Sequence, residues 1–528
     1  MRFGVLTLSA LLSALAHPPL GWWWLMLLAP APLFGYLPGK RARVGFLYGW
    51  WWGFVYGLVV GFPLTYLVKL QTGSLWLTGI GWIGVVGLSA LFWGLFGALA
   101  TRMPRSVLGC LGLAGLWTLC QWLRGLGPFA FVWGHFAVSL YRVPLLLQVA
   151  DLGGAWGLEF LVAFWNALLG IGLMARLSGG LSMGVPTLRI SGRNERTAIR
   201  FWLAAVLLWT FWLGYGVARR AEFSSRMVLN SDAKASLATL ALVQPNVNLA
   251  RTYTPDEWEP VRVQIAQQVQ QVAAHRPSLI VLPESLEPYP LPDVAEAFEF
   301  WGRLAQKISA PILVGGYRIG NPLTGQYTNT VHLFLPDGSW RYHDKVQLVP
   351  LGETVPFREQ LPFLQAFGVV ERDLLPGDSL EPLRVEHLRI GAVICMESTY
   401  PWIARALTRH GANLLVVISN ESWFGRTAAL EQHLAFSVLR AVETRRWLIR
   451  CAPEGISAFI APDGRVWRVP AFQAATPVQT VRLMDVPTFY VRTGDWIVLA
   501  SAVLATLGGF MSVRVRAAHA SCDRPAAT

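Results

Sequence analysis

Apolar residues in this chain are gathered into long blocks, and these blocks predict membrane-spanning helices. Most of the blocks have the ~20 residues that a helix needs to cross a bilayer, and the first two are shorter. The pattern predicts a multi-pass α-helical membrane domain of about eight helices, with about seven inside residues 1–217 and one at 494–513. The apolar runs lie at about 3–17, 22–37, 44–67, 75–100, 107–124, 154–175, 201–217 and 495–513.

The first apolar run allows two interpretations. It carries Arg2, an apolar core and Ala14-Leu15-Ala16, which are also the features of a cleaved signal peptide. A retained helix is favoured, because Trp22-Trp23-Trp24 open the next run almost at once and tryptophan gathers at membrane interfaces. Both interpretations place residues 218–493 on the same side of the membrane.

Residues 218–493 have a different pattern, in which short apolar runs rich in β-branched residues alternate with amphipathic stretches. Such alternation predicts an α/β domain whose sheets are covered by helices. The expected strands lie at 237–244, 278–282, 311–315, 329–335, 388–394, 413–419, 447–451 and 457–461. The expected helices lie near 256–274, 293–308, 401–409 and 427–445.

Composition and charge support the membrane interpretation. The chain is 54% hydrophobic, only 14% charged and has a net charge of +13. With the N-terminus in the cytoplasm, the inside segments hold fourteen basic residues against only Glu195 and Asp523. These segments are the N-terminus, 38–43, 101–106, 176–200 and the tail at 514–528. The positive-inside rule is therefore satisfied, no nucleic-acid partner is expected, and residues 218–493 are expected outside the cytoplasm.

Three of the expected strand ends present reactive groups: Glu284 after Leu279–Leu282, Lys345 after His343-Asp344, and Cys395 after Gly391–Ile394. A thiol becomes a strong nucleophile only as thiolate, which needs a base such as Glu284 and a cation such as Lys345. The amine and the backbone N–H of Met396 could also hold an oxyanion. Taken singly, Cys395 reads as a core residue, Glu284 as a loop acid and Lys345 as half of a surface ion pair; their conjunction favours catalysis.

Other polar residues are expected to be structural. His135, Asp151 and Glu159 lie around the fifth and sixth helices, Cys451 reads as a core thiol and His433 as packing. The five cysteines have no paired spacing, so neither a disulfide framework nor a metal site is expected.

The elements Pro283-Glu284, Lys345…Gly352-Glu353 and Cys395-Met396-Glu397 resemble those of the nitrilase (carbon–nitrogen hydrolase) superfamily. With the membrane helices and the runs 343–356 and 419–425, the chain resembles the apolipoprotein N-acyltransferase family over essentially its whole length. The resemblance implies a nitrilase-like four-layer αββα sandwich on an eight-helix base in the cytoplasmic (inner) membrane of a bacterium. We expect no cofactor and a monomer.

The resemblance also implies an activity. Such enzymes move a fatty acyl chain from a membrane phospholipid onto the cysteine as a thioester, and then to the α-amine of the diacylglyceryl-cysteine of an apolipoprotein. By motif position Cys395 is the nucleophile, Glu284 the general base and Lys345 the oxyanion and thiolate partner, with Glu353 and Glu397 as supporting acids. A membrane-tethered amidase acting on a small amide and a non-catalytic envelope protein remain as alternatives.

The stretch 356–367 is unusually apolar for a loop, and we expect it to form a lipid-facing lid. The candidate lid residues are Phe357, Leu361, Phe363, Leu364 and Phe367. The alternative is a loop tucked into the core.

Overall fold

The computed structural model describes residues 1–179, 192–229, 237–288, 290–291, 293–367 and 373–522. The chain divides into two compact units: the first comprises 1–62, 82–218 and 495–528, and the second comprises 63–81 and 219–494. The segment 63–81, which the sequence pattern placed within the membrane domain, thus groups with the second unit. Parts of the expected inside segments, 180–191 and 523–528, lie outside the described residues.

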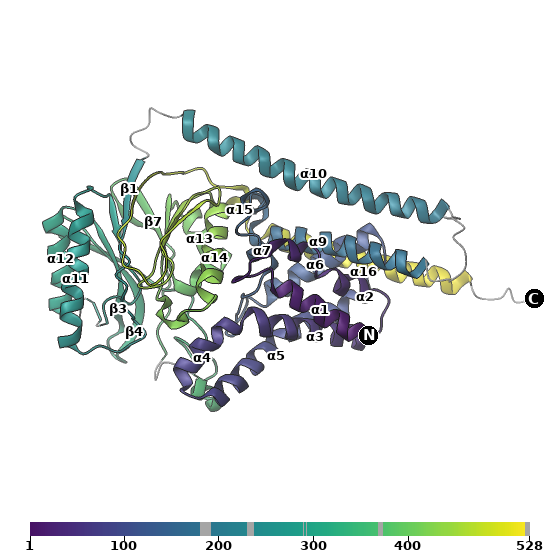
Figure 1. Cartoon of the computed structure of the whole chain (residues 1–528), viewed down its shortest axis with the longest axis horizontal. Coiled ribbons are helices and arrows are strands. Elements are labelled where there is room, and N and C mark those ends of the chain that lie inside the picture. Colours follow the sequence, from purple (N-terminus) through teal and green to yellow (C-terminus); the bar gives the residue numbers. More distant parts are fainter. Residues whose placement is uncertain (180–191, 230–236, 289, 292, 368–372, 523–528) are drawn as a thin grey trace, which may run out of the picture. The chain divides into compact units, whose positions relative to one another are not determined.

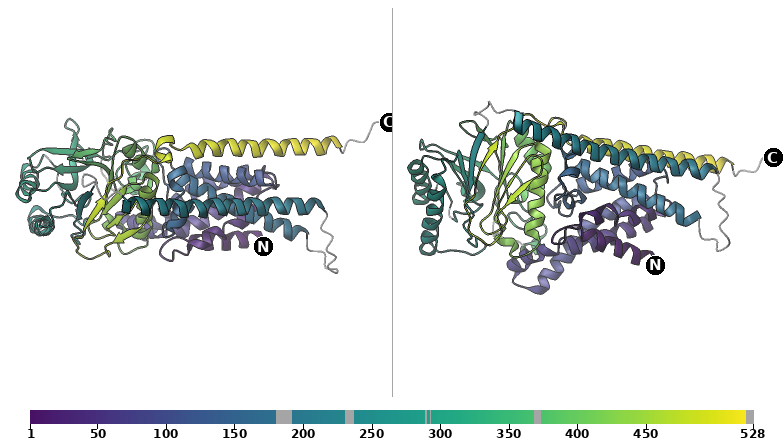
Figure 2. Two further views of the ribbon diagram at one scale, coloured as in Figure 1. Left: turned by 90° about the horizontal axis from the view of Figure 1, so that it is seen from above. Right: turned by 45° about the horizontal axis from the view of Figure 1, so that its top comes forward.

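The first unit is helical. Its elements are α1 (Arg2–Ala14), η1 (Trp23–Leu27), α2 (Ala31–Tyr36), α3 (Ala42–Val60), α5 (Leu75–Ala100), α6 (Val107–Leu123), α7 (Phe136–Ser139), α8 (Pro144–Leu147), α9 (Ala150–Gly179), α10 (Gly192–Leu229) and α16 (Trp496–Cys522), with the ends of α5 and α10 reaching into the second unit. Helix α16 lies along α6, and α6 lies against α9 (Figures 1 and 2).

Among the described helices, those at Leu75–Ala100, Ala150–Ala175 and Ile199–Phe223 are long and apolar enough to cross a membrane. A fourth candidate is the pair Ala42–Val60 and Phe62–Thr72, which is bent by 54°. The helical, apolar character of this unit is therefore confirmed, whereas eight spans stay a prediction.

The expected helix at 22–37 is wrong as a single element. The chain there forms the 3-10 turn η1 and then the six-residue helix α2. Pro30 and Pro32 explain the break, because proline lacks a backbone N–H and its ring clashes with the preceding helical turn.

Close helix packing in the first unit depends on glycines. A Cβ on Gly97 of α5 would lie 2.1 Å from the carbonyl oxygen of Gly45 in α3. A Cβ on Gly35 of α2 would likewise lie 2.5 Å from the carbonyl oxygen of Gly170 in α9. Small residues at such crossings let two backbones approach, which is how helices pack where lipid replaces water.

The second unit is built on two six-stranded sheets. One has the strand order β12-β1-β2-β3-β4-β5 and the other β11-β10-β9-β8-β7-β6. The first sheet comprises β1 (Leu237–Leu242), β2 (Leu279–Val281), β3 (Ile312–Asn321), β4 (Gln326–Phe334), β5 (Trp340–Asp344) and β12 (Val478–Arg482). The second comprises β6 (Leu383–Val385), β7 (Leu388–Ile394), β8 (Leu414–Ile418), β9 (Trp447–Cys451), β10 (Ala458–Ile460) and β11 (Val466–Arg468).

Alternation along the strands produces four layers. In β1, Leu240 and Leu242 belong to the core between the sheets, whereas Ala241 faces the helices α11 (Pro255–Ala273) and α12 (Ala295–Ile308). On the far side of the second sheet lie α13 (Pro401–Arg409) and α14 (Ala429–Thr444) (Figure 1). The nitrilase-like αββα sandwich expected from the sequence is confirmed.

The remaining described elements are short. They are η2 (Phe62–Leu64), α4 (Thr65–Thr72), η4 (Pro362–Phe367), η5 (Cys395–Thr399), η6 (Glu421–Phe424) and α15 (Phe489–Thr493). The turn η2 spans the boundary between the two units.

Candidate active site

The three predicted catalytic residues come from three separate strand ends and are brought into one buried cluster. Glu284 follows β2, Lys345 follows β5 and Cys395 follows β7. Their exposed fractions are 3%, 1% and 9%. The Lys345 Nζ lies 3.5 Å from the Glu284 Oε1, and the charges of both residues act on the Cys395 thiol.

Glu284 is held by three donors. Its Oε1 accepts a hydrogen bond of 2.8 Å from the Asn329 side chain and faces Lys345, and its Oε2 accepts one of 2.5 Å from the backbone N–H of Asn420. The close approach of β3 depends on Gly315, because a Cβ there would lie 2.5 Å from the Glu284 Cα. The carboxylate is therefore fixed in place.

Lys345 is a buried cation between two carboxylates. Its Nζ donates to the Glu353 Oε1 at 2.9 Å, and Asn329 donates to the same oxygen at 2.8 Å. Burial works against the charged amine, but Glu353 and Glu284 outweigh it and raise the pKa of Lys345 well above its ordinary value. Lys345 is thus a permanent positive charge in a site with little water.

Cys395 is a protonated thiol in this resting arrangement. Burial raises the pKa of Cys395 well above that of a free cysteine, the Glu284 charge raises it further, and Lys345 lowers it. The Ser419 hydroxyl lies 3.5 Å from the Cys395 sulfur. A thiolate can therefore form only when a base takes the proton, and Glu284 is the carboxylate placed to do so.

The backbone at Cys395 is strained, with φ at +56° in the left-handed region. This conformation ends β7 abruptly and begins η5, in which Met396 is the second residue. Near the start of a helical turn, backbone N–H groups lack intrahelical partners, so the N–H of Met396 can serve a reacting oxygen.

Glu397 ties this turn to the Lys345 loop. Its Oε1 accepts from the backbone N–H groups of Val346 (2.7 Å) and Gln347 (3.0 Å), and its Oε2 accepts from that of Ile394 (2.7 Å). Burial raises the pKa of Glu397 to about 7, although Lys345 and these N–H groups lower it. Glu397 therefore holds the nucleophile turn and the lysine loop together.

A further contact to Cys395 comes from His433, which the sequence predicts to be a packing residue. It is fully buried, with its Nε2 3.1 Å from the Cys395 carbonyl oxygen. The Ser398 hydroxyl donates to the same oxygen at 2.8 Å. Because that carbonyl can only accept, the His433 Nε2 carries the proton.

Behind His433 stands a buried acid–base pair. The Arg450 Nη2 is bonded to Glu421 and lies 2.8 Å from the His433 Nδ1. Burial and the Arg450 charge lower the pKa of His433, and the Glu421 Oε1 lies 3.1 Å from the same Nδ1. The histidine is therefore oriented by Arg450 and Glu421 and lies against the carbonyl of Cys395.

The other residues named from the sequence lie elsewhere. Both Glu159 oxygens are bonded, to the Trp117 indole (2.8 Å) and the Ala137 backbone (3.0 Å), and Asp151 accepts from Tyr215. Cys451 is a buried free thiol whose Sγ donates to the Val243 carbonyl. Within the described ranges, no cluster of His, Cys, Asp or Glu could hold a metal ion.

The candidate lid lies next to the segment 63–81 within the second unit. Phe357 and Phe363 are 52% and 63% exposed, whereas Leu361, Leu364 and Phe367 are half-buried. The Phe367 ring approaches Gly81, where a Cβ would come within 2.8 Å of it, and η4 contacts α4.

Family models match two parts of the chain. The model of the carbon–nitrogen hydrolase family matches residues 239–485, and that of the apolipoprotein N-acyltransferase N-terminal domain matches residues 9–168. Among solved structures, Saccharomyces cerevisiae Nit3, a member of branch 10 of the nitrilase superfamily, is 20% identical over 47% of this chain and 90% of that chain, with a TM-score of 0.37.

Full-length relatives extend the match to both units. The apolipoprotein N-acyltransferase of Gloeobacter violaceus is 30% identical over 94% of this chain and 91% of its own length. That of Azotobacter vinelandii is 31% identical over 97% and 94%. The chain therefore belongs to the apolipoprotein N-acyltransferase family.

Proposed function

We propose that the protein is an acyltransferase of a bacterial inner membrane that completes lipoprotein maturation. It transfers a fatty acyl chain from a membrane phospholipid to the N-terminal α-amine of the diacylglyceryl-cysteine of an apolipoprotein. The observation that carries the proposal is the buried cluster of Glu284, Lys345 and Cys395 in a chain of this family.

In the first half-reaction Glu284 takes the proton of Cys395, and the sulfur attacks the ester carbonyl of the phospholipid. Lys345 and the Met396 N–H hold the oxyanion of the tetrahedral intermediate. The C–O bond then breaks, the proton passes from Glu284 to the leaving alkoxide, and a lysophospholipid departs. The acyl group remains on Cys395 as a thioester.

In the second half-reaction the α-amine of the acceptor attacks the thioester. Glu284 takes the proton of the attacking nitrogen and returns it to sulfur as the C–S bond breaks. Hydrolysis competes with this step, and the near-complete burial of Glu284, Lys345 and Cys395 supports transfer because it limits water at the thioester.

Glu353 and Glu397 are supporting acids in this scheme. Glu353 holds Lys345 through a 2.9 Å contact, and Glu397 holds the turn that carries Cys395. Phe357, Leu361, Phe363, Leu364 and Phe367 are proposed as a lid that meets lipid. The catalytic unit is placed on the extracytoplasmic side, on the support of the basic inside segments, and the enzyme acts as a monomer.

The test is intact-mass measurement of the purified protein after incubation with phospholipid. We expect a fatty-acyl increment on the wild type, none on Cys395→Ala, and the increment retained on Cys451→Ala, which removes a buried thiol outside the cluster. Addition of a diacylglyceryl peptide should then discharge the acyl group onto its amine. A wild type that stays unacylated beside a competent donor would sink the proposal. The amidase alternative is not favoured, because the family model for the N-terminal domain matches the helical unit.

A further inference from the structure

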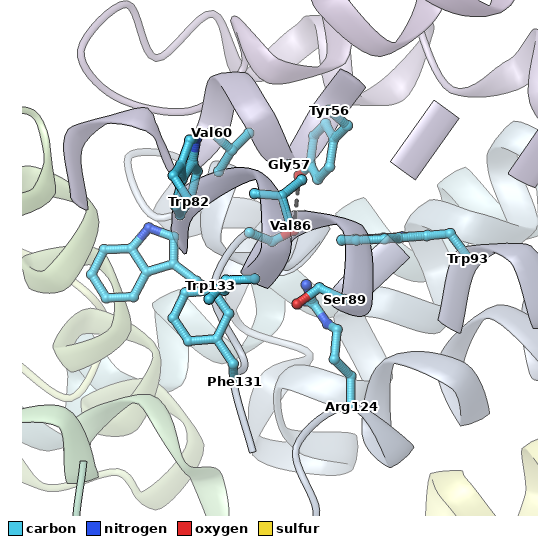
Figure 3. Close-up of a pocket in the computed structure, with 13 residues that line it drawn as sticks. Tyr56, Gly57, Val60, Trp82, Val86, Ser89, Trp93, Arg124, Phe131 and Trp133 are labelled. Atoms are coloured by element: carbon cyan, nitrogen blue, oxygen red, sulfur yellow. Dashed lines mark hydrogen bonds between the residues drawn. The ribbon is translucent and has the colours of Figure 1, made fainter. Parts of the chain in front are cut away.

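The first unit contains a pocket that belongs to none of the machinery described above. Its cavity volume is about 20 Å³, and about 320 Å³ of space is free of atoms when the open solvent at its mouth is counted. Its walls come from the end of α3, the middle of α5, Arg124 after α6 and the segment that follows (Figure 3). The lining residues are Tyr56, Gly57, Val60, Gly61, Trp82, Val85, Val86, Ser89, Trp93, Arg124, Phe131, Trp133 and Gly134.

Arg124 is a buried charge that the described residues leave without a hydrogen-bond partner at two of its nitrogens. It is 3% exposed, and its Nε and Nη2 have no acceptor within the part of the chain that the structure describes. Its guanidinium carbon lies 4.6 Å above the Trp93 ring, which favours a cation but supplies no acceptor. Figure 3 shows the side chain reaching into the pocket.

The same pocket is lined by two further hydrogen-bond donors that have no acceptor among the described residues. The indole nitrogens of Trp82 and Trp93 are buried, and neither has a hydrogen-bond partner among the described residues. Buried tryptophan N–H groups usually find a partner, and a buried arginine is costly unless its donors are satisfied. Donors without acceptors call for a ligand rich in acceptors and negative in charge.

Neighbouring acceptors are already in use. The Tyr56 hydroxyl donates to the Gly134 carbonyl at 2.8 Å and contacts the His17 ring at 2.7 Å. Both oxygens of Glu159, the carboxylate whose charge acts on Arg124, are bonded elsewhere. Neither Tyr56 nor Glu159 can therefore turn to Arg124 without giving up a hydrogen bond that it already makes.

We propose that this pocket binds the phosphodiester of a phospholipid, with Arg124 as its anion-binding residue and Trp82 and Trp93 as additional donors. Arginine presents a planar fork of donors that matches a phosphate oxygen pair. Val60, Val86 and Phe131 form apolar walls beside it, which suit the chains of a lipid rather than free phosphate. That the bound lipid is the acyl donor rests on the proposed function; the binding itself does not.

The test compares lipid affinities of the full-length protein in detergent by native mass spectrometry. Cys395→Ala is the background, so that no acyl transfer consumes the lipid. The probes are dioleoylphosphatidylglycerol, dioleoylglycerol, which lacks the phosphate, and inorganic phosphate as a competitor. We expect Arg124→Gln to weaken binding of the phospholipid at least tenfold and to leave dioleoylglycerol unchanged.

The matched control is Arg105→Gln. Arg105 is an exposed arginine of the same unit whose Nη2 donates to the Pro38 carbonyl at 3.0 Å, and its replacement should change neither affinity. Trp82→Phe keeps an aromatic ring at this position but removes the indole N–H. It should weaken phospholipid binding by about two- to tenfold. This variant decides the matter if Arg124→Gln does not fold.

Three outcomes would overturn the inference. Unchanged phospholipid affinity in Arg124→Gln and Trp82→Phe would show that the pocket does not bind the phosphodiester. An equal loss of affinity for the phospholipid and for dioleoylglycerol would show that Arg124 acts only in packing. Competition by millimolar phosphate without preference for the phospholipid would make it a free-phosphate site. Phospholipid binding in the Cys395→Ala background, together with a wild type that stays unacylated beside the same lipid, would instead count against the proposed function alone.

Discussion

At the residue scale, the position of Cys395, the proposed nucleophile, is fixed by hydrogen bonds to its own carbonyl oxygen. The left-handed backbone of Cys395 costs about 1–3 kcal/mol and persists only if the surroundings hold it. Ser398 and His433 both donate to the Cys395 carbonyl, and Arg450 orients the histidine. His433 is therefore a positioning residue that acts on the reaction through Cys395.

Replacing His433 should slow acylation without weakening substrate binding. We expect His433→Phe to lower the rate of acyl-enzyme formation by up to about 100-fold with an unchanged KM for phospholipid, because a small misplacement of a reacting atom has effects of this size. His433→Gln, which restores a donor near Nε2, should recover most of the rate. Stopped reactions followed by intact mass give both constants, and a loss that appears in KM or is not rescued by glutamine would argue for packing alone.

Sequence reasoning reached Glu284 and Cys395 because each one ends an apolar run abruptly, which is a local signal, and reached Lys345 through the motif 343–356. It missed Asn329, which bonds Glu284 from 45 residues away, and the donation of His433 to Cys395 across 38 residues. A neutral amide in a strand or a histidine in a buried helix has no local mark of its function. Such partners become visible only when the fold brings the elements together.

At the scale of elements, Glu397 couples the Lys345 loop to the end of β7, and this coupling depends on pH. Its pKa is raised from 4.5 to about 7 in the folded protein. Between these values the folded protein binds one more proton than the unfolded chain, so the free energy of unfolding falls as pH rises through this window. The contribution is on the order of 3 kcal/mol.

Glu397→Gln should remove this pH dependence. We expect Glu397→Gln to be destabilised at pH 5, because the amide N–H₂ would face a backbone N–H. The stability of the variant should not change with this titration, so the difference in unfolding free energy between variant and wild type should shrink as pH rises from about 5 to 7.5. Denaturant unfolding of the full-length protein across this range measures it. Glu386→Gln, at an exposed glutamate of the same sheet, is the control and should keep the wild-type slope. A pH-independent difference in Glu397→Gln would contradict the assignment.

The glycine contact between α3 and α5 makes a second prediction about elements. Gly97→Ala should destabilise the protein by about 1–3 kcal/mol, because the new Cβ would overlap the Gly45 carbonyl oxygen and force the helices apart. Gly87→Ala is the matched control on α5, since nothing lies within 4 Å of its added Cβ. Thermal unfolding in detergent compares the two, and equal midpoints would show that the crossing tolerates a side chain.

Element boundaries set the limit of prediction from the sequence. The alternation within 218–493 led to the two-sheet sandwich, because strand periodicity is short and repeated. The apolar block at 44–67 did not reveal that α3 ends at Val60 and bends by 54° before α4. Nor did it reveal that 63–81 packs with the second unit, because hydropathy cannot distinguish lipid from protein as the partner of an apolar face.

At the scale of the whole molecule, charge supports the proposed orientation in the membrane. The expected inside segments concentrate basic residues, and by the positive-inside rule we propose that 218–493 lie outside the cytoplasm. Labelling of introduced cysteines can test this orientation, because a maleimide should not reach the native thiols of Cys110, Cys120, Cys395 and Cys451, which are all buried. Cys522 is replaced by serine to remove the remaining thiol.

Single cysteines at two exposed positions then report the orientation. Leu323→Cys lies on the turn between β3 and β4 at a side chain that is 96% exposed, and Arg41→Cys lies in the expected inside segment 38–43 at an exposed residue. A membrane-impermeant maleimide applied to spheroplasts should label Leu323→Cys at once and Arg41→Cys only after lysis. The reverse pattern would place the catalytic cluster in the cytoplasm. That result would contradict the proposed extracytoplasmic placement of the acyl transfer.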